Sequence, residues 1–225
     1  HTPISQGTVM PSDERILPLF PLNSVLFPGA SIPLQIFEDR YKQMLQDCLD
    51  ADSRSGIVLI KSGGEVGAPA EPYSKGTVAQ IVQSNEIDGG RFLVSATGVQ
   101  RFVINEILQR LPYISARVEL LVEDQDPWLP NTEMEVIRQA YSRYASLVSG
   151  LSGGWVRSAR GPDDPVALSY HIAETLRIDL DEKQSLLEES SASRRLEAEL
   201  DILRRDSDRL SQRMAVELMS RFGRQ

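Results

Sequence analysis

The chain has 225 residues, of which 41% are hydrophobic and 25% are charged, and its formal net charge at pH 7 is −8. This composition is typical of a globular protein and excludes a disordered or a fibrous one. The excess of 32 Asp+Glu over 24 Lys+Arg also argues against a protein that gains affinity by neutralising the phosphates of a nucleic-acid duplex.

Short apolar segments, separated by prolines and glycines, predict strands in the first half of the chain. Residues 16–20 and 32–37 are two such segments, and the prolines within and beside them, Pro18, Pro21, Pro28 and Pro33, cannot donate a ladder hydrogen bond. We therefore expect short strands, edges or bends there, rather than long central strands. Asp88-Gly89-Gly90 is typical of a hairpin turn, because glycine tolerates positive φ. Further strands are predicted at residues 56–61, 76–84, 91–97, 99–107 and 113–121.

One helix interrupts the predicted strands. In residues 38–50, Tyr41, Met44, Leu45 and Cys48 recur at steps of three and four, which indicates one apolar face of a short helix. On that face we expect Cys48 to be a buried structural thiol rather than a nucleophile, and a single cysteine excludes an intrachain disulfide. About six short strands with one helix predict a curled sheet or a small barrel.

The second half of the chain is predicted to be helical, after an acidic linker at residues 123–130 that contains prolines. Thr132 and Glu135 have the spacing of a capping box, and Asp164-Pro165 has that of an N-cap and a first-turn proline. Further helices are predicted at residues 181–189 and 192–222, the last with leucines near heptad spacing. The fold class is therefore α+β, with a β-rich subdomain at residues 1–123 and a helical subdomain at residues 131–225.

Several motifs resemble those of the N-terminal, substrate-recognition domain of the Lon protease family. The first four, in matching order and spacing, are Leu17-Pro18-Leu19-Phe20-Pro21-Leu22, Phe27-Pro28-Gly29, Ile32-Pro33-Leu34 and Phe37-Glu38-Asp39-Arg40-Tyr41. Later ones are Gly76-Thr77-Val78-Ala79, Gly98-Val99-Gln100-Arg101-Phe102, Pro112-Tyr113, and residues 172–176 and 182–188. The resemblance implies a β-rich subdomain of PUA-like type (pseudouridine synthase and archaeosine transglycosylase), followed by a helical bundle with a long last helix. It also implies recognition of unfolded or degron-bearing substrates.

No catalytic residue, metal site or cofactor is expected. The only lysines are Lys42, Lys61, Lys75 and Lys183, and none follows a glycine, so a P-loop for ATP is absent. The Ser–Lys protease module of Lon lies outside the region of resemblance. One cysteine and two histidines, His1 and His171, are too few for an ordinary zinc site.

The candidate binding residues are Phe20, Pro21, Phe27, Pro28, Glu38, Arg40, Tyr41 and Trp155. We expect the loop from Phe20 to Phe27 to form the rim of the site, although a strand edge that contains proline is poor at strand addition. Some of these residues have a structural alternative: Glu38 and Arg40 pin the short helix to neighbouring strands, and Trp155 anchors its own loop on the bundle. Trp128 is expected to plug the junction between the two subdomains.

Three classes of function remain open. The first is a non-catalytic module that binds unfolded or degron-bearing proteins, or a protease or chaperone partner. The second is RNA binding, which PUA-like domains suggest by analogy and the acidic charge opposes. The third is catalysis, either proteolysis or an unrecognised hydrolysis. No apolar run approaches the ~20 residues that span a bilayer and no signal peptide is predicted, so we expect a cytoplasmic protein. The last helix packs on its neighbours or supports self-association.

Overall fold

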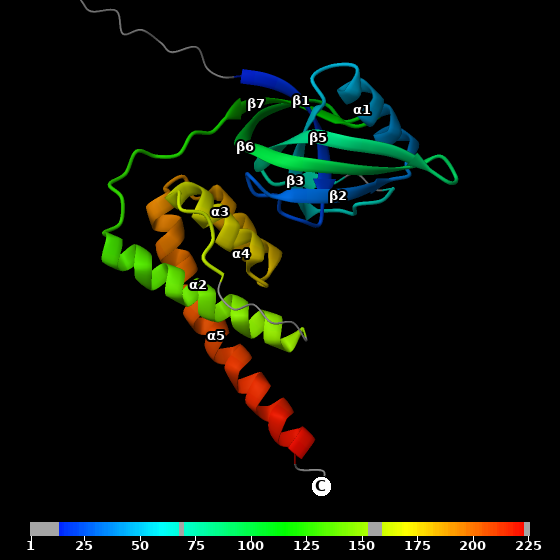
Figure 1. Cartoon of the computed structure of the whole chain (residues 1–225). Coiled ribbons are helices and arrows are strands. Elements are labelled where there is room, and N and C mark those ends of the chain that lie inside the picture. Colours follow the sequence, from blue (N-terminus) through cyan, green and yellow to red (C-terminus); the bar gives the residue numbers. More distant parts are fainter. Residues whose placement is uncertain (1–13, 68–69, 153–158, 223–225) are drawn as a thin grey trace, which may run out of the picture.

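A computed structural model of the chain describes residues 14–67, 70–152 and 159–222, with only the backbone of residues 217, 218, 221 and 222 (Figure 1). Strands occupy the chain up to Leu120, and four helices follow from Asn131 onward in the described part. The structure confirms the α+β class, with a β-rich part followed by helices. The division into domains at residues 1–123 and 131–225 stays a prediction.

Among the described residues, five strands close into a barrel. β1 (Glu14–Leu22) pairs with β7 (Ile114–Leu120) through residues 14–19 and with β3 (Arg54–Ser62) through residues 19–22. β5 (Lys75–Ile87) and β6 (Arg91–Gln109) complete the ring between β3 and β7. In the described ladders, the first half of β1 pairs only with β7 and the second half only with β3, so each half has one side without a ladder partner. Pro18 and Pro21, which lack an N–H group, can therefore lie in a strand of the barrel wall.

The barrel interior is filled by side chains, so the barrel is a core and not a channel. The predicted alternation in β7 is confirmed, since Ile114, Ala116 and Val118 are buried. A Cβ atom on Gly56 would lie 2.6 Å from a methyl carbon of Leu19, so the tight interior requires glycine there. The interior cluster consists of Leu17, Leu19, Val58, Val78, Phe102, Ile114, Ala116 and Val118.

The hairpin of β5 and β6 extends beyond the barrel. β5 pairs with β3 only over residues 77–80 of the described ladder, so residues 81–87 pair with β6 alone. β2 (Ser31–Ile36) pairs with the other side of β6 and forms an edge. The expected turn is confirmed, because Gly89 and Gly90 have φ angles of 80° and 66°.

One strand prediction was wrong. The segments 91–97 and 99–107 were expected to be separate strands, but β6 is continuous through Gly98. A Cβ atom on Gly98 would collide with the carbonyl oxygen of Phe27, and the Gly98 amide donates to Ala30 O at 2.8 Å. This glycine therefore marks the close approach of another segment, not a break in the strand.

The short helix α1 (Asp39–Leu49) confirms the predicted apolar face, with Tyr41, Met44, Leu45 and Cys48 buried. This face belongs to the same buried cluster as Phe20 of β1 and Ile57 of β3, the strands that α1 contacts. Burial, followed by the nearby Asp52 and Asp47, raises the pKa of the Cys48 thiol to about 12, so the thiol stays protonated at neutral pH. β4 (Glu71–Pro72) adds a short ladder to β3.

The helical part contains α2 (Asn131–Leu151), α3 (Pro165–Thr175), α4 (Leu180–Glu188) and α5 (Ala192–Phe222). α3 and α4 lie between the barrel and the crossed pair of α2 and α5, and the end of α5 projects away from the barrel (Figure 1). The N-cap of α3 is confirmed, because the Asp164 carboxylate accepts from Ala167 N at 2.8 Å. Within the described residues, none of the helices has the length and apolarity needed to cross a membrane.

Two expectations about the start of the helical part were wrong. α2 begins at Asn131, so Thr132 already lies inside the helix and its hydroxyl cannot cap it. Trp128 is 59% exposed and does not plug the junction, because residues 121–130 run over the surface as a strap held by polar contacts. One such contact is the Ser193 hydroxyl, which donates to Pro127 O at 3.1 Å.

Candidate functional site

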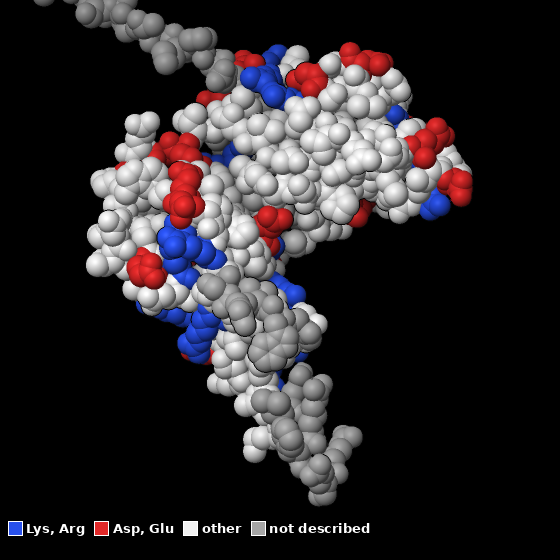
Figure 2. All heavy atoms as spheres, viewed as in Figure 1, with Lys and Arg blue, Asp and Glu red and all other residues white. Residues whose placement is uncertain are grey.

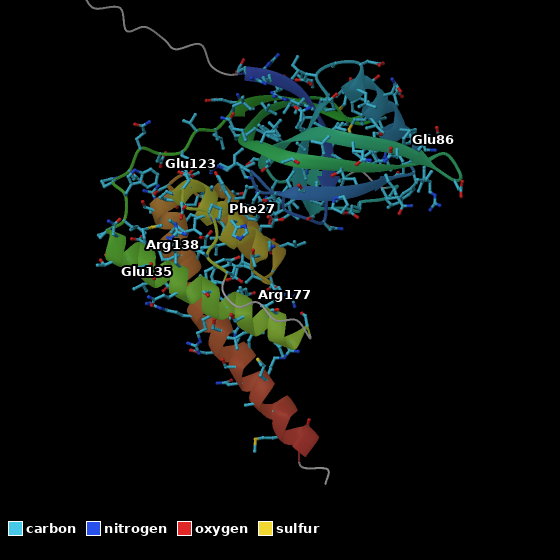
Figure 3. All side chains as sticks on the ribbon, in the orientation of Figure 1. Phe27, Glu86, Glu123, Glu135, Arg138 and Arg177 are labelled. Atoms are coloured by element: carbon cyan, nitrogen blue, oxygen red, sulfur yellow. The ribbon has the colours of Figure 1, made fainter. Side chains whose placement is uncertain are left out.

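The structure separates the eight predicted site residues into groups. One group lies where the second half of β1 meets the first turn of α1, and its members are Phe20, Pro21, Glu38, Arg40 and Tyr41. Phe27 and Pro28 lie at the junction of the barrel and the helices (Figure 3). Trp155 lies outside the described residues. Pro28 lines a shallow cavity of 440 Å³ at that junction. The first group surrounds a smaller but more enclosed cavity with mostly apolar walls, which makes it the candidate site.

A cavity of 330 Å³, named here the Tyr41 pocket, opens beside the first turn of α1. Four segments that are distant in the sequence supply its walls: β1, α1, the loop after β3, and the loop between β6 and β7. Its lining is mostly apolar and aromatic, the usual composition of a site that takes up an apolar group. The lining residues are Pro21, Arg40, Tyr41, Gly67, Ala70, Arg110, Leu111, Tyr113 and Ile114.

The ring of Tyr41 is held from two sides. Phe20 packs edge-on against it with ring centroids 4.3 Å apart, and the Arg40 guanidinium lies 4.6 Å from its centroid. Burial raises the pKa of the Tyr41 phenol, so the ring is neutral at physiological pH. A neutral aromatic wall with fixed orientation presents a rigid apolar surface to a ligand.

The ion pair of Glu38 and Arg40 fixes the start of α1. An Arg40 Nη lies 3.1 Å from a Glu38 carboxylate oxygen, and both side chains are partly buried. Glu38 also accepts from the backbone amide of Gly67 at 3.4 Å. The pair therefore holds α1 against the loop after β3. The sequence had suggested that it would hold α1 against neighbouring strands instead. Both groups take part in shaping the Tyr41 pocket.

Sequence reasoning missed the wall formed by the loop between β6 and β7. Leu111 stands at its rim with 80% of its surface exposed. Tyr113 is fixed by its hydroxyl, which donates to the Asp47 carboxylate at 2.6 Å. Burial and this hydrogen bond raise the pKa of Tyr113 to about 12. The Pro112-Tyr113 motif was visible in the sequence, but nothing local showed that barrel closure brings it to Tyr41.

Apolar surface continues beyond the Tyr41 pocket. A smaller hollow of 70 Å³, named here the Phe37 hollow, shares Tyr41 with the pocket and is also lined by Phe37, Val66 and Gln35. Phe37 and Val66 are both exposed, as is Leu111. Contiguous exposed apolar residues on a folded protein commonly mark an interaction surface. In the described part of the chain, no group of His, Cys, Asp or Glu residues has the arrangement of a metal site.

Phe27 has a different environment, since it is fully buried at the junction and its ring centroid is 6.3 Å from that of Tyr170. Beside it, Glu123 of the strap lies between two buried guanidinium groups. One carboxylate oxygen is 2.9 Å from Arg101 Nη2, and the other is 2.8 Å from Arg195 Nη2. Figure 3 shows Phe27 and Glu123 where the barrel meets the helices. The Glu123 carboxylate forms ion pairs with both guanidinium groups, so the junction joins the two parts of the molecule.

The comparisons with known proteins agree on one family. The family model for the ATP-dependent protease La (LON) substrate-binding domain matches residues 16–205. Lon protease 2 of Myxococcus xanthus is 29% identical over 197 residues, which are 85% of this chain and 24% of the relative. Lon protease of Escherichia coli (strain K12) is 32% identical over 192 residues, 82% of this chain and 24% of the relative. The chain thus spans about a quarter of the length of these relatives.

Solved structures share the fold. The Lon N-terminal domain protein from Xanthomonas campestris superposes with a TM-score of 0.63 at 28% identity, over 83% of this chain and 98% of that one. The N-terminal domain of Mycobacterium avium complex Lon protease has a TM-score of 0.54 at 19% identity, over 84% of this chain and 98% of that one. At that identity the second likeness shows a common fold only.

Proposed function

Because the chain belongs to the ATP-dependent protease La (LON) substrate-binding domain family, we propose that it is a non-catalytic module that binds exposed segments of unfolded or degron-bearing proteins. We place the contact at the Tyr41 pocket. The observation that carries this proposal is the pocket itself, a cavity of 330 Å³ with apolar and aromatic walls. Leu111 at its rim is 80% exposed, although nothing else in the described fold requires an exposed leucine there.

The physical basis for selecting unfolded chains is the burial of apolar side chains. A folded protein keeps most of its large apolar side chains inside, whereas an unfolded one offers them to a pocket. Transfer of one such side chain from water contributes about 1.5–3 kcal/mol, which offsets only part of the cost of association. We therefore expect weak binding of single side chains and tighter binding of longer segments.

Binding without catalysis is supported by the residues present. The P-loop pattern is absent from the 225 residues, and the region that resembles Lon proteases is their substrate-binding domain. In our proposal a cytoplasmic protease or chaperone partner processes what this module holds. The net charge of −8 favours a polypeptide over RNA as the ligand, because phosphate contacts need an excess of cations.

The direct test is fluorescence anisotropy with three labelled ligands: an unfolded protein, the same protein folded, and a single-stranded RNA, each across a range of salt concentrations. The proposal expects binding of the unfolded form only, with weak dependence on salt. Binding of RNA that falls steeply with salt, without binding of either polypeptide, would replace this function with RNA recognition.

Self-association is a separate part of the proposal, and we place it at the projecting end of α5. Val216 and Met219 are exposed there, beyond the apolar seam that packs α5 against α2 and α3. Sedimentation of the wild type and of a Val216→Gln/Met219→Gln variant tests it. Equal monomeric behaviour of both proteins at high concentration contradicts self-association through this helix.

A further inference from the structure

The Tyr41 pocket is one end of a longer surface. The Tyr41 pocket and the Phe37 hollow share Tyr41, and the Phe37 hollow shares Gln35 with a third cavity of 310 Å³. This third cavity, named here the β2 hollow, lies on the outer face of the sheet formed by β2, β6 and the second half of β5. The shared residues make the three cavities neighbours in a row.

The β2 hollow differs from the Tyr41 pocket in having no charged side chain among its described lining residues. Figure 2 shows a broad uncharged face over β5, β6 and β2, with charged side chains at the hairpin tip and along the top of the barrel. A quarter of all residues in this chain are charged. A surface of this extent without charge therefore suits a ligand that is itself uncharged, since a charged group would lose hydration there without gaining a partner.

Three side-chain amides face this hollow without internal partners. Gln35 on β2 and Asn85 on β5 lie opposite the same residue of β6, Leu93, and Gln83 lies one row away. None of the three amides makes a hydrogen bond with another residue of the described chain. Each carries a carbonyl acceptor and an NH₂ donor, the same pair of groups that a peptide bond presents. They are therefore matched to the backbone of a polypeptide.

The open edge of β2 is unsuited to an added strand, which decides how a polypeptide would lie. The hydrogen bond from Gly98 N to Ala30 O makes Ser31 and Thr97 a non-hydrogen-bonded pair. Alternation along the ladder then turns the nitrogen of Pro33 toward the open edge, where it has no proton to donate. A partner segment is consequently held by side chains on the face of the sheet, and not by pairing with its edge.

We infer that the three cavities form one groove for a single extended polypeptide segment, which is uncharged where it crosses the β2 hollow. Arg40 and Arg110 line the Tyr41 pocket, and Glu38 and Glu65 line the Phe37 hollow. An apolar side chain of the segment fills the Tyr41 pocket, and its peptide groups bond to Gln35, Gln83 and Asn85. Recognition of backbone groups is independent of side-chain identity, as capture of many different unfolded chains requires. The inference rests on the proposed function and adds to it the class of substrate: segments that can become fully extended and that include an uncharged stretch.

The test uses the full chain and two labelled peptides. One is an uncharged peptide of about twelve residues, roughly 40 Å long when extended, with one phenylalanine near an end. The other is a peptide of about four residues with the same phenylalanine. The variant Gln83→Ala/Asn85→Ala removes two amides outside the Tyr41 pocket. Its matched control, Gln43→Ala/Gln212→Ala, removes two amides that line none of the three cavities.

We expect Gln83→Ala/Asn85→Ala to weaken binding of the long peptide about five- to tenfold and to leave the short peptide unchanged. The control variant should bind both peptides as the wild type does. Methylation of backbone nitrogens in the far half of the long peptide should weaken its binding to the wild type but not to the amide variant.

Two results distinguish this inference from the proposed function. If the long and short peptides bind the wild type equally, or the amide variant keeps full affinity for the long peptide, the extended groove is wrong and the Tyr41 pocket still stands. If neither peptide binds the wild type, the proposed function itself is contradicted and the groove is rejected with it.

Discussion

Arg101 of β6 and Arg195 of α5 donate to the same backbone oxygen, the carbonyl of Glu189, at 2.8 and 2.6 Å. They are 1% and 0% exposed, and the carboxylate of Glu123 lies between them. The Tyr170 hydroxyl also donates to Glu123. Barrel, strap and helices thus meet at one partly buried carboxylate, which holds the pocket-bearing barrel in a fixed position relative to α5.

The first prediction concerns this carboxylate. Glu123→Gln removes the only negative charge that faces both guanidinium groups among the described contacts, so two buried cations lose their counterion. We expect a loss of about 3 kcal/mol in the free energy of unfolding, measured by urea denaturation. Asp208→Asn is the control, because its ion pair with Arg143 is exposed and should change stability by less than about 0.5 kcal/mol. Equal effects of both substitutions would contradict a structural role for the junction.

A second prediction concerns pH. Glu199 of α5 is fully buried, and neither carboxylate oxygen has a hydrogen-bond partner in the described structure. Burial raises the pKa of Glu199 well above its usual value of 4.5, and Arg195 opposes this only in part. The folded state therefore holds a proton that the unfolded state releases, so this group makes stability fall as the pH rises above about 4.5.

Glu199→Gln removes this ionisation, so the variant should gain stability relative to the wild type as the pH increases. Urea unfolding of both proteins at pH 5, 7 and 8.5 measures the difference. A difference in unfolding free energy that stays constant over this range shows that Glu199 does not titrate as its burial implies.

A third prediction tests the rim of the Tyr41 pocket. Leu111→Ser removes an apolar contact but leaves folding unaffected, because the side chain is already exposed. We expect affinity for an unfolded polypeptide to fall about tenfold, with an unchanged midpoint of thermal unfolding. Ile16→Ser is the matched control, since Ile16 is also exposed but lines no part of the pocket. Loss of affinity in both variants, or in neither, counts against the pocket.

A fourth prediction compares two glycines. Gly98→Ala places a methyl group against the carbonyl oxygen of Phe27, a backbone atom, and should cost more than about 2 kcal/mol of stability. Gly150→Ala in α2 places one 3.5 Å from the Met214 methyl carbon, an ordinary contact, and should stabilise the helix by about 0.5–1 kcal/mol. Denaturant unfolding gives both values. A Gly98→Ala variant as stable as the wild type would show that the Phe27 backbone is not tightly packed against Gly98.

Patterns that depend on neighbouring residues were predictable from the sequence. The face of α1, the turn at Gly89 and Gly90, the N-cap at Asp164 and the bounds of α5 all follow from local spacing. The order of strand and helix patterns led to the correct fold class, and the family motifs led to five of the residues around the Tyr41 pocket and the Phe37 hollow. These features are local because periodicity, caps and turn residues act within a few positions of the chain.

Features that depend on chain closure were not predictable. Gly98 resembles a strand break, yet it is required by Phe27, which lies seventy-one positions earlier. Leu111 and Tyr113 reach Tyr41 only because β1 pairs with both β7 and β3. Trp128 was assigned to the junction by its flanking prolines, but the polar attachment of the strap leaves it in solvent. Nothing in the local sequence encodes these long-range contacts.

An NMR titration of the isotopically labelled chain with an unfolded polypeptide shows directly whether the Tyr41 pocket is the binding site. We expect chemical shifts to change first at residues 37–41, 64–67 and 110–114, which surround the Tyr41 pocket, and Leu111→Ser to suppress these changes. Shift changes confined to the junction around Val122 and Tyr170, or no changes at saturating polypeptide, would contradict binding at the Tyr41 pocket.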